Sequence, residues 1–454
     1  MPKDLWRSEV KMGLYFKLTL CRPISLSDWA VLQKYTRRVR YVRQGPNRHL
    51  YISTRERWTL DDAFLLALCA ASAPTPLLPN LKSLKWNVSS DAHLSALHRL
   101  VSPSLTSLDL NFWAGALSLD LNTAVQFRLE EVFPSLKSLV VGSGTAIPPS
   151  LLRGLQSSIL PLQNLVTIDW NDLRSDTIMS LSQLPALREA TFSIPSDFSR
   201  FSEILPPHLS KRKGFSNLRN LCITCDTPAS LLSFVSCFTF NLDFVFVKCG
   251  PLNPSQIGDL FMSLVSSPSH SMQAISVHGD KFRSLEESWV VLQPPLSMRE
   301  LRPLLQFKEL QHLYLNIQCH PIALNDMELL EMADAWPNLI GLRLEGFTKL
   351  GSHVTPYALI ALFDRCPKLR VDFEPSSIPN LLNIRNRQYL GYLYLGWYNI
   401  AYPDAIARFL ACFVPDKVDV DMYWHGSIGQ AAESDIYEER WDETREIFDR
   451  IRST

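Results

Sequence analysis

A short leucine-spaced core recurs along the chain, and it constrains the fold more than any other feature of the sequence. In its fullest form a proline stands two residues before the first leucine, as Pro337 stands before Leu339 in the stretch from Asp334 to Gly346. The same pattern begins at Pro79, Pro103, Pro134, Pro185 and Pro367. Similar cores without the proline are Leu162–Trp170, Phe215–Ile223, Phe307–Leu315 and Arg387–Leu395, with weaker candidates at Asn241–Val247 and Met272–Val277. Spacing between successive cores runs from about 22 to about 38 residues, which is inside or just beyond the range of leucine-rich repeats.

The spacing within each core predicts a strand that buries one face. In Leu-x-x-Leu-x-Leu the last two leucines lie on the same side of a strand, and the residue between them faces the other way. Segments between cores have helical spacing: Met327, Leu330 and Ala333 or Asp334 follow a helical period, with Asn325 or Asp326 as the cap. Proline is then expected to end the helix and occupy the first strand position. One such unit cannot bury its own leucines, so neighbouring units must stack.

We therefore predict an α/β fold, a leucine-rich-repeat solenoid of irregular helix–strand units with a parallel concave sheet. The alternative is an α/β sheet protein whose strands merely share leucine spacing. The solenoid is expected over residues 76–430, after a helical N-terminal segment and cap over 1–75 that contains helical stretches at Ser27–Val42 and Trp58–Ser72. A C-terminal amphipathic helix is expected over 431–454. Its apolar face would cap the last repeat or dock a partner helix, and it carries Tyr437, Trp441, Thr444, Phe448 and Ile451.

Composition narrows the classes of partner and compartment. Lys plus Arg and Asp plus Glu each number 45, so no global charge attracts nucleic acid or an anionic membrane, and neither is expected as a partner. Nine scattered cysteines favour reduced thiols, and hence a cytoplasmic or nuclear protein, over a disulfide framework. No stretch approaches the roughly 20 apolar residues that span a bilayer.

The motifs that would carry chemistry are weak or missing in the sequence. Cys222 and Cys225 form the one C-x-x-C pair, but they lie inside an expected strand, where positions three apart face opposite sides. His93 and His98 are interpreted as residues on a helix surface, and no phosphate-binding loop or nucleophile elbow is present. We therefore expect no enzyme, no catalytic or metal-binding residue and no cofactor. A basic cluster is interpreted as the solvated face of an amphipathic helix, and comprises Lys34, Arg37, Arg38, Arg40 and Arg43.

The remaining candidates for function are surface residues between the strand leucines. Aromatic and arginine side chains on a rigid concave sheet are suitable anchors for a protein partner, although some of these residues could simply solvate the sheet. The candidate partner-binding residues are Lys85, Asp109, Asp169, Tyr314, Asn316, Arg343, Glu345, Tyr394 and Trp397.

The run Arg22–Val42, the Pro-x-Leu cores and the stretch Asp326–Gly346 together resemble the fungal family of F-box/leucine-rich-repeat-like proteins. The resemblance extends from about residue 4 to 415. It implies the target-recognition part of an F-box type ubiquitin-ligase receptor, which holds its target for a recruited enzyme and performs no chemistry itself. In the family an F-box precedes the run that begins at Arg22, so residues 1–75 would be a remnant that follows it. A Skp-type adaptor and a cullin are expected partners only if such an F-box lies upstream. The alternative is a free-standing leucine-rich-repeat scaffold.

Overall fold

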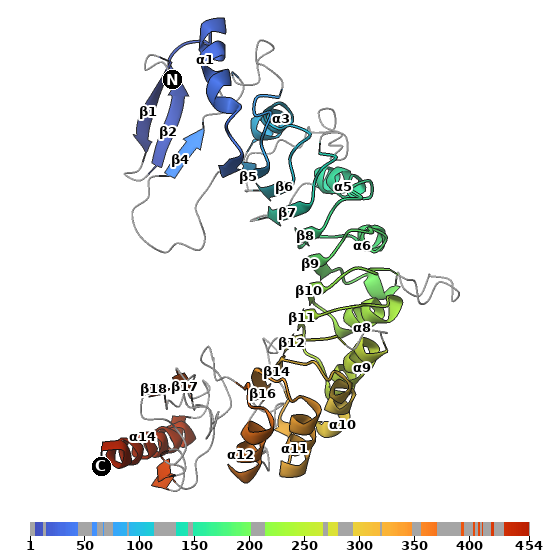
Figure 1. Ribbon diagram of the computed structural model, residues 1–454, viewed down its shortest axis with the longest axis vertical. Helices are drawn as coiled ribbons and strands as arrows, with labels where there is room; N and C mark the ends of the chain where they lie inside the picture. The colour runs from blue at the N-terminus through green and yellow to red at the C-terminus, as the bar shows by residue number, and fades with distance from the viewer. Residues whose placement is uncertain are drawn as a thin grey trace. The chain divides into compact units, whose positions relative to one another are not determined.

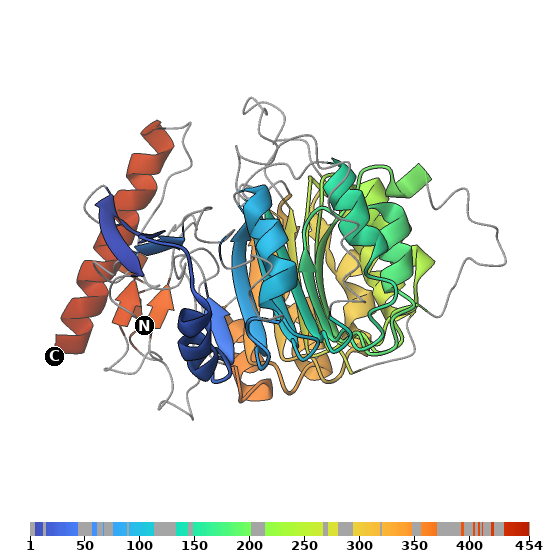
Figure 2. The same ribbon diagram turned by 90° about the horizontal axis from the view of Figure 1, so that it is seen from above.

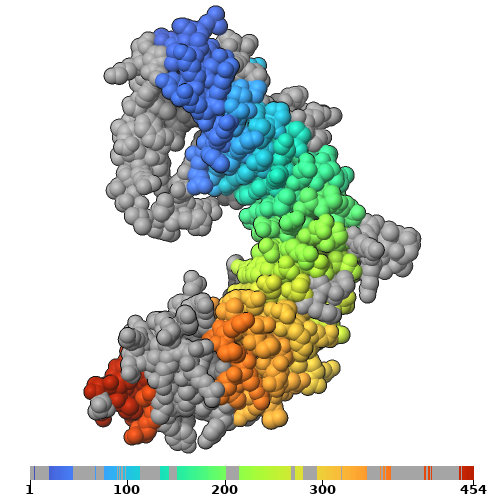
Figure 3. All heavy atoms as spheres, viewed as in Figure 1, coloured from blue at the N-terminus to red at the C-terminus, as the bar shows by residue number. Residues whose placement is uncertain are grey.

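The computed structural model of the chain contains two compact units, Met1–Ser193 and Ile194–Thr454, and each is described by itself (Figure 1). Figure 3 shows the atoms of the second unit, from yellow-green to orange, packed in the order of the sequence. The structure describes residues 5–11, 15–43, 57–60, 67, 76–88, 90–112, 133–143, 149–200, 214–266, 271–279, 294–317, 320–346, 356–369, 392–394, 403–404, 407–408, 411, 419–421 and 431–453.

Each unit contains parallel strands paired in the order of the sequence, as a leucine-rich-repeat architecture requires. In the first unit the strands are β3 (Tyr41–Arg43), β5 (Ser83–Val88), β6 (Ser107–Phe112), β7 (Ser138–Ser143), β8 (Thr167–Trp170) and β9 (Glu189–Ile194). In the second they are β10 (Asn220–Cys225), β11 (Phe244–Cys249), β12 (Ala274–Gly279), β14 (His312–Ile317) and β16 (Gly341–Gly346). The two weaker leucine cores are therefore true strands, β11 and β12.

Helices follow the strands and lie on one side of them. Figures 1 and 2 show α3, α5 and α6 on one side of the first unit's strands, and α8, α9 and α11 on one side of the second unit's. The first unit contains α1 (Leu26–Thr36), α3 (Asp91–Leu100), α5 (Pro149–Ser157) and α6 (Ser175–Leu181). The second contains α8 (Pro228–Cys237), α9 (Pro254–Val265), α10 (Met298–Leu301), the 3-10 helix η3 (Arg302–Gln306), α11 (Asp326–Ala335), α12 (Pro356–Arg365) and α14 (Ala431–Ser453). This arrangement confirms the predicted fold class.

A tight turn precedes most of the leucine cores, and in the cores with proline the proline lies in this turn. The Leu339 N–H donates to the Trp336 carbonyl at 3.0 Å, across Pro337 and Asn338. The same bond, from each core's first leucine to the carbonyl three residues before it, is made by Leu81, Leu105, Leu136, Leu187 and Leu369. Proline suits the second position of such a turn because its ring fixes φ near −65°. The expectation that proline occupies the first strand position is wrong, since β16 begins after the turn, at Gly341.

Alternate strand residues are buried, as the leucine spacing predicts. In β14 the side chains of Leu313, Leu315 and Ile317 are at most 1% exposed, while His312, Tyr314 and Asn316 are partly exposed. Parallel register places each buried residue beside its equivalent in the next repeat, as Leu313 lies between Ile275 and Leu342. Leucine, isoleucine and valine therefore form continuous buried rows that no single repeat could cover, which is the main source of stability in such a stack.

Helix α11 forms where expected, but its buried face differs from the prediction. Asn325 is the cap: its side chain accepts from the Glu328 N–H at 3.0 Å, and the Glu328 carboxylate accepts from the Asn325 N–H at 2.9 Å. Met327, which was expected to begin the apolar face, is 74% exposed, whereas Met332 is fully buried. The buried residues Leu329, Met332 and Ala333 follow the same period with a different phase.

Among the described residues of 1–75, helix α1 overlaps the helical stretch expected at Ser27–Val42, but strands form in other parts that were expected to be helical. Strands β1 (Trp6–Lys11) and β2 (Tyr15–Leu20) pair antiparallel, and β4 (Arg57–Leu60), at the start of the expected second helix, pairs parallel with β2. Helix α1 ends at Thr36 instead of continuing to Val42, and β3 follows it. Pairing of β3 with β5 supplies backbone hydrogen bonds that override the helical spacing of this segment. The basic cluster therefore spans a helix end, a turn and a strand.

The C-terminal helix is present, and its apolar face is buried where its side chains are described. In α14 the side chains of Thr444 and Phe448 are at most 1% exposed and Ile451 is partly exposed, whereas those of Tyr437 and Trp441 lie outside the described residues. Its role as a cap, and the boundaries at residues 75 and 430, stay predictions. Two pairs of short parallel strands lie apart from the long rows: β13 (Leu296–Ser297) with β15 (Ile322–Ala323), and β17 (Tyr392–Tyr394) with β18 (Asp419–Asp421). Among the described residues, no helix has the length and apolar character needed to cross a membrane.

Candidate partner-binding face

Five ring-bearing side chains lie on the outward face of the second unit's sheet, opposite the buried leucine rows. They occupy the strand positions between buried residues, on the three adjacent strands β11, β12 and β14, and all are partly exposed. We call this group the ring patch, and it comprises Phe244, Phe246, His278, His312 and Tyr314.

Ring contacts and hydrogen bonds fix the positions of these side chains. The Phe246 and His278 rings are 5.0 Å apart between centroids, and those of His312 and Tyr314 are 5.8 Å apart. His278 Nε2 lies 2.9 Å from the Ser276 hydroxyl, and His312 Nδ1 lies 3.0 Å from the Tyr314 hydroxyl. Aromatic side chains held in this way lose little conformational entropy when a partner covers them.

Gly341 on β16 makes room for the His312–Tyr314 pair. A Cβ atom at this position would lie 2.6 Å from the Tyr314 hydroxyl oxygen and 2.8 Å from His312 Nδ1, both shorter than real Cβ contacts. The missing side chain thus lets both polar groups rest against the backbone of the next strand. Burial lowers the pKa of His312 below its ordinary value of 6.5, so the imidazole is neutral at pH 7.

Small and cationic side chains complete this face around the rings. In register, Ala274 lies between Phe244 and His312, so two ring-bearing strands flank a position without a large side chain. Lys248 precedes the buried end of β11 and is exposed, and Arg343 is the register neighbour of Tyr314 on β16.

The outward face of the first unit has a different chemistry. Lys85 and Asp109 are register neighbours and form an ion pair at 2.6 Å, so their charges are satisfied within the sheet. Asp169 is separated from Asp109 by Val140 in register; burial raises the pKa of Asp169, and the Asp109 carboxylate raises it further. Ser83, Ser107, Ser138 and Thr167 form a row of hydroxyls across β5 to β8. Apart from Val140, these described outward side chains are polar, and Lys85 and Asp109 pair with each other.

The structure places the sequence-based candidates in several groups. Lys85, Asp109 and Asp169 lie in the first unit, and Tyr314, Asn316 and Arg343 lie in the second, each at the outward position predicted for it. Glu345 lies on β16, and Tyr394 lies on β17, a strand that is separate from the long rows. The side chains of Glu345 and Tyr394, and all of Trp397, fall outside the described residues.

Sequence reasoning missed four of the five ring-patch residues. Phe244, Phe246, His278 and His312 lie in or beside the cores, but residues 244–247 are apolar throughout, so the sequence alone does not indicate which of them face outward. The histidines could not be distinguished from ordinary solvated residues, because the ring contact of His278 comes from Phe246 on the neighbouring strand and the space that His312 occupies comes from Gly341 on β16.

The motifs considered for metal binding do not form a metal site in the described part of the chain. Cys222 is partly exposed and Cys225 is buried, on opposite faces of β10 as predicted, and both are free thiols. Cys225 is the register neighbour of Cys249; a hydrogen bond with Cys249 and burial raise the pKa of the Cys225 thiol. No group of three or more His, Cys, Asp or Glu residues suited to a metal ion occurs among the described residues. The surface position expected for His93 is wrong, since it is 4% exposed and its ring lies 5.8 Å from that of Trp86.

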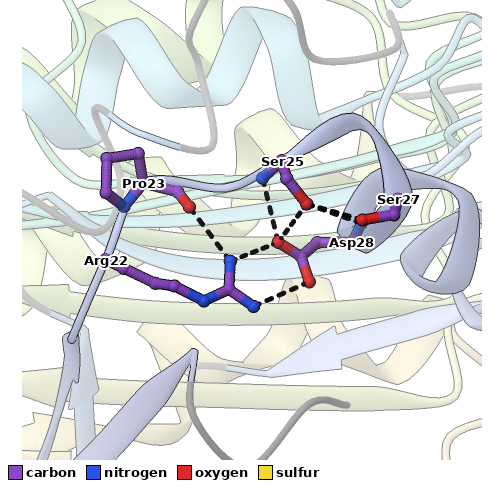
Figure 4. Close-up of polar contacts among 5 residues, drawn as sticks. All are labelled: Arg22, Pro23, Ser25, Ser27 and Asp28. Carbon is purple, nitrogen blue, oxygen red and sulfur yellow. Dashed lines mark hydrogen bonds and ion pairs between the residues drawn. The ribbon is translucent and has the colours of Figure 1, made fainter.

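The run that begins at Arg22 forms a locked helix start (Figure 4). The Arg22 guanidinium contacts both carboxylate oxygens of Asp28, at 2.5 and 3.1 Å. Asp28 also accepts from the Ser25 N–H and hydroxyl at 2.9 and 2.7 Å, while the Asp28 N–H donates to the Ser25 hydroxyl. These contacts with Arg22 and Ser25 hold the pKa of Asp28 well below its usual range. The segment thus begins α1 with a capping box closed by an ion pair.

Comparison with known proteins gives similarities to solved structures alone. No protein-family model matches the chain, and no curated protein matches it. Among solved structures, the chain is similar to an internalin from Listeria monocytogenes, with a TM-score of 0.36 and 12% sequence identity over 75% of this chain and 78% of that one.

Proposed function

We propose that the chain is a non-catalytic protein-binding repeat scaffold, and that a protein partner contacts the ring patch of the second unit. The observation that supports this proposal is the ring patch itself, five adjacent rings on the outward side of β11, β12 and β14. Contacts with Ser276 and the space above Gly341 hold these side chains before any partner arrives.

Aromatic anchors on a rigid surface are the usual source of binding energy in protein interfaces. A few such residues dominate affinity, because they bury large areas and lose few rotamers. Charged pairs such as Lys85–Asp109 contribute little, since both charges are already satisfied and solvent screens them. Partner binding is therefore assigned to the second unit's ring patch rather than to the first unit's polar face.

The test compares two doubly substituted variants of the full chain. Phe246→Asp with Tyr314→Asp places two carboxylates in the ring patch, and Met262→Asp with Met327→Asp places the same charges on exposed positions of α9 and α11. Affinity capture from cells followed by quantitative mass spectrometry is expected to show partners that bind wild type and the helix variant but not the ring-patch variant. Equal retention by all three proteins would refute the proposal.

A finer assignment is that the scaffold recognises targets for an F-box type ubiquitin ligase. It is supported by the resemblance of Arg22–Val42, whose Arg22–Asp28 ion pair and capping box give this run a defined conformation. The alternative is a free-standing scaffold. Expression from the native locus with a C-terminal tag, followed by mass spectrometry, separates the two. Co-purification of a Skp-type adaptor and a cullin is expected for the ligase receptor, and their absence from a preparation that retains ring-patch partners supports the free scaffold.

A further inference from the structure

We propose that the first unit binds a single-stranded nucleic acid along the edge where its strands begin, with cationic side chains on the phosphates and exposed tyrosines against the bases. This surface lies in the first unit, so the inference is independent of the ring patch and goes beyond the proposed function. It follows from two rows of side chains that parallel register brings together.

A row of cations crosses the first unit at the position just before each strand. Backbone hydrogen bonds of 2.7 to 2.9 Å join consecutive members of this row, and each is donated to the carbonyl of the member before it. Two of the six members are Thr106 and Val166, and the other four are an arginine or a lysine with an exposed side chain. We call these four residues the basic row, and they are Arg40, Lys82, Lys137 and Arg188.

The basic row continues into the basic cluster at the end of α1. Asn80 connects the two: its side-chain amide donates to the Arg37 carbonyl at 2.7 Å, and its own carbonyl accepts from the Arg40 guanidinium at 3.1 Å. Asn80 stands two residues before Lys82, so Arg37, Arg40 and Lys82 are held around it. Arg38, which follows Arg37, is exposed as well. The end of the row at β3 therefore carries the highest density of positive charge.

None of these cations forms an ion pair with a carboxylate in the part of the chain that the structure describes. Lys82 Nζ donates to the Ser104 carbonyl at 3.3 Å, which leaves its charge uncompensated. The corresponding row of the second unit carries one cation in five positions, Arg219, and its guanidinium lies 3.7 Å from the Asp243 carboxylate. The neutral composition of the whole chain gave no reason to expect nucleic acid, but local charge complementarity favours a polyanion at this edge.

A row of hydroxyls lies beside the basic row, one residue further along each strand. Ser83, Ser107, Ser138 and Thr167 are neighbours in register, and all are partly exposed. Lysine, arginine, serine and threonine side chains are the common donors to phosphate oxygens. Glu189 continues this row on β9, where its carboxylate accepts from the Thr167 hydroxyl at 3.3 Å. That negative charge disfavours phosphate at β9, so the nucleic acid is expected over β3 to β7.

Two exposed tyrosines at the β3 end favour a nucleic acid over an acidic protein segment. Tyr41 is 77% exposed and is the register neighbour of Ser83, so it lies at the end of the row of hydroxyls. Tyr35, in the last turn of α1, is 56% exposed. An exposed ring among cations is a surface on which an unpaired base can stack, whereas the bases of a duplex are already stacked on one another. The tyrosines therefore favour a single strand.

The test is fluorescence anisotropy of the full chain with a fluorescein-labelled oligothymidine of about twelve nucleotides, a length that single-strand-binding folds cover. Lys82→Glu with Lys137→Glu is expected to weaken binding about tenfold or more. The slope of log affinity against log salt should become less negative by about 1.4 in this variant, because two phosphate contacts and their counterion release are lost. Tyr41→Ala should weaken binding about fivefold or more through lost stacking.

A matched charge reversal controls for the net charge of the protein. Arg153→Glu with Arg174→Glu makes the same change at exposed positions in α5 and just before α6, and binding is expected to stay within about twofold of wild type. All variants should keep the Tm of wild type, since every substituted side chain is exposed. Equal loss in both charge-reversed variants, unchanged binding by Tyr41→Ala, or no binding by wild type would overturn the proposal. Displacement of the probe by a polyglutamate peptide as readily as by unlabelled oligothymidine would also overturn it, in favour of an acidic protein segment.

Discussion

Two methionines of helix α11 provide a test of the fold with the same substitution made twice. Met332 is fully buried and Met327 is 74% exposed, five residues apart on one helix. Replacing a buried methionine by alanine removes its transfer free energy and leaves a cavity, and costs about 2–5 kcal/mol. The same change at Met327 removes no buried contact, and alanine is a slightly better helix former. We therefore expect Met332→Ala to destabilise the protein by about 3 kcal/mol and Met327→Ala to change its stability by less than about 0.5 kcal/mol.

Thermal unfolding followed by circular dichroism measures this difference. A domain of roughly 200 residues shifts its Tm by about 2–4 °C per kcal/mol, so Met332→Ala should lower the Tm of the second unit by about 6–12 °C. Urea titration gives the same comparison as a free energy, provided that the slope m is unchanged. Equal destabilisation by both variants, or a Met332→Ala protein as stable as wild type, would refute the assignment of the buried face of α11 and the stacking of repeats that depends on it.

Three further outcomes are expected from local contacts. Asn325→Ala removes the cap of α11 and should cost about 1 kcal/mol in urea unfolding, whereas Asn325→Gly should cost only a few tenths. Burial lowers the pKa of His320 in the folded protein, so the unfolded chain binds more protons than the folded one. The free energy of unfolding should therefore fall as the pH drops below about 6.5. The loss between pH 7.5 and 5.5 should be smaller in His320→Gln than in wild type. Exposed Cys21 should react with a thiol reagent within seconds to minutes, and buried Cys225 only when the protein opens, because its pKa is raised and its sulfur is shielded.

The repeats could be predicted because their signal is local and occurs many times. Leucines at fixed spacing report the buried face of each strand without knowledge of its neighbours, and the strands at residues 244–249 and 274–279 formed even where the pattern was weak. The phase of α11 could not be predicted in this way. Met327 and Met332 are equally apolar, and only the position of the helix against its neighbours determines which one is buried.

The strands of the N-terminal segment were not predicted, because they depend on pairing between distant residues. The segment Tyr41–Arg43 has helical spacing when considered alone, but it pairs with Ser83–Lys85, forty-two positions along the chain. Strand β4 likewise pairs with β2, about forty positions before it in the chain, although residues 58–60 were expected to begin a helix. The spacing of nearby residues carries no information about backbone hydrogen bonds to a distant strand, and these bonds determine that the segment forms a strand instead of a helix.

The residues of the candidate site could also be predicted only in part from the sequence, because the site depends on how the strands are aligned. Burial of every second strand residue identifies the positions that the core leaves free, so Tyr314 and Arg343 could be selected from the sequence. Which free residues meet depends on parallel register, and register depends on how each irregular connection returns to the sheet. The glycine at 341 illustrates this, because it is one ordinary residue in the sequence, yet it is where the hydroxyl of Tyr314 and the imidazole of His312 come to rest. A leucine pattern therefore predicts where a partner can bind, and the register determines what chemistry the partner meets.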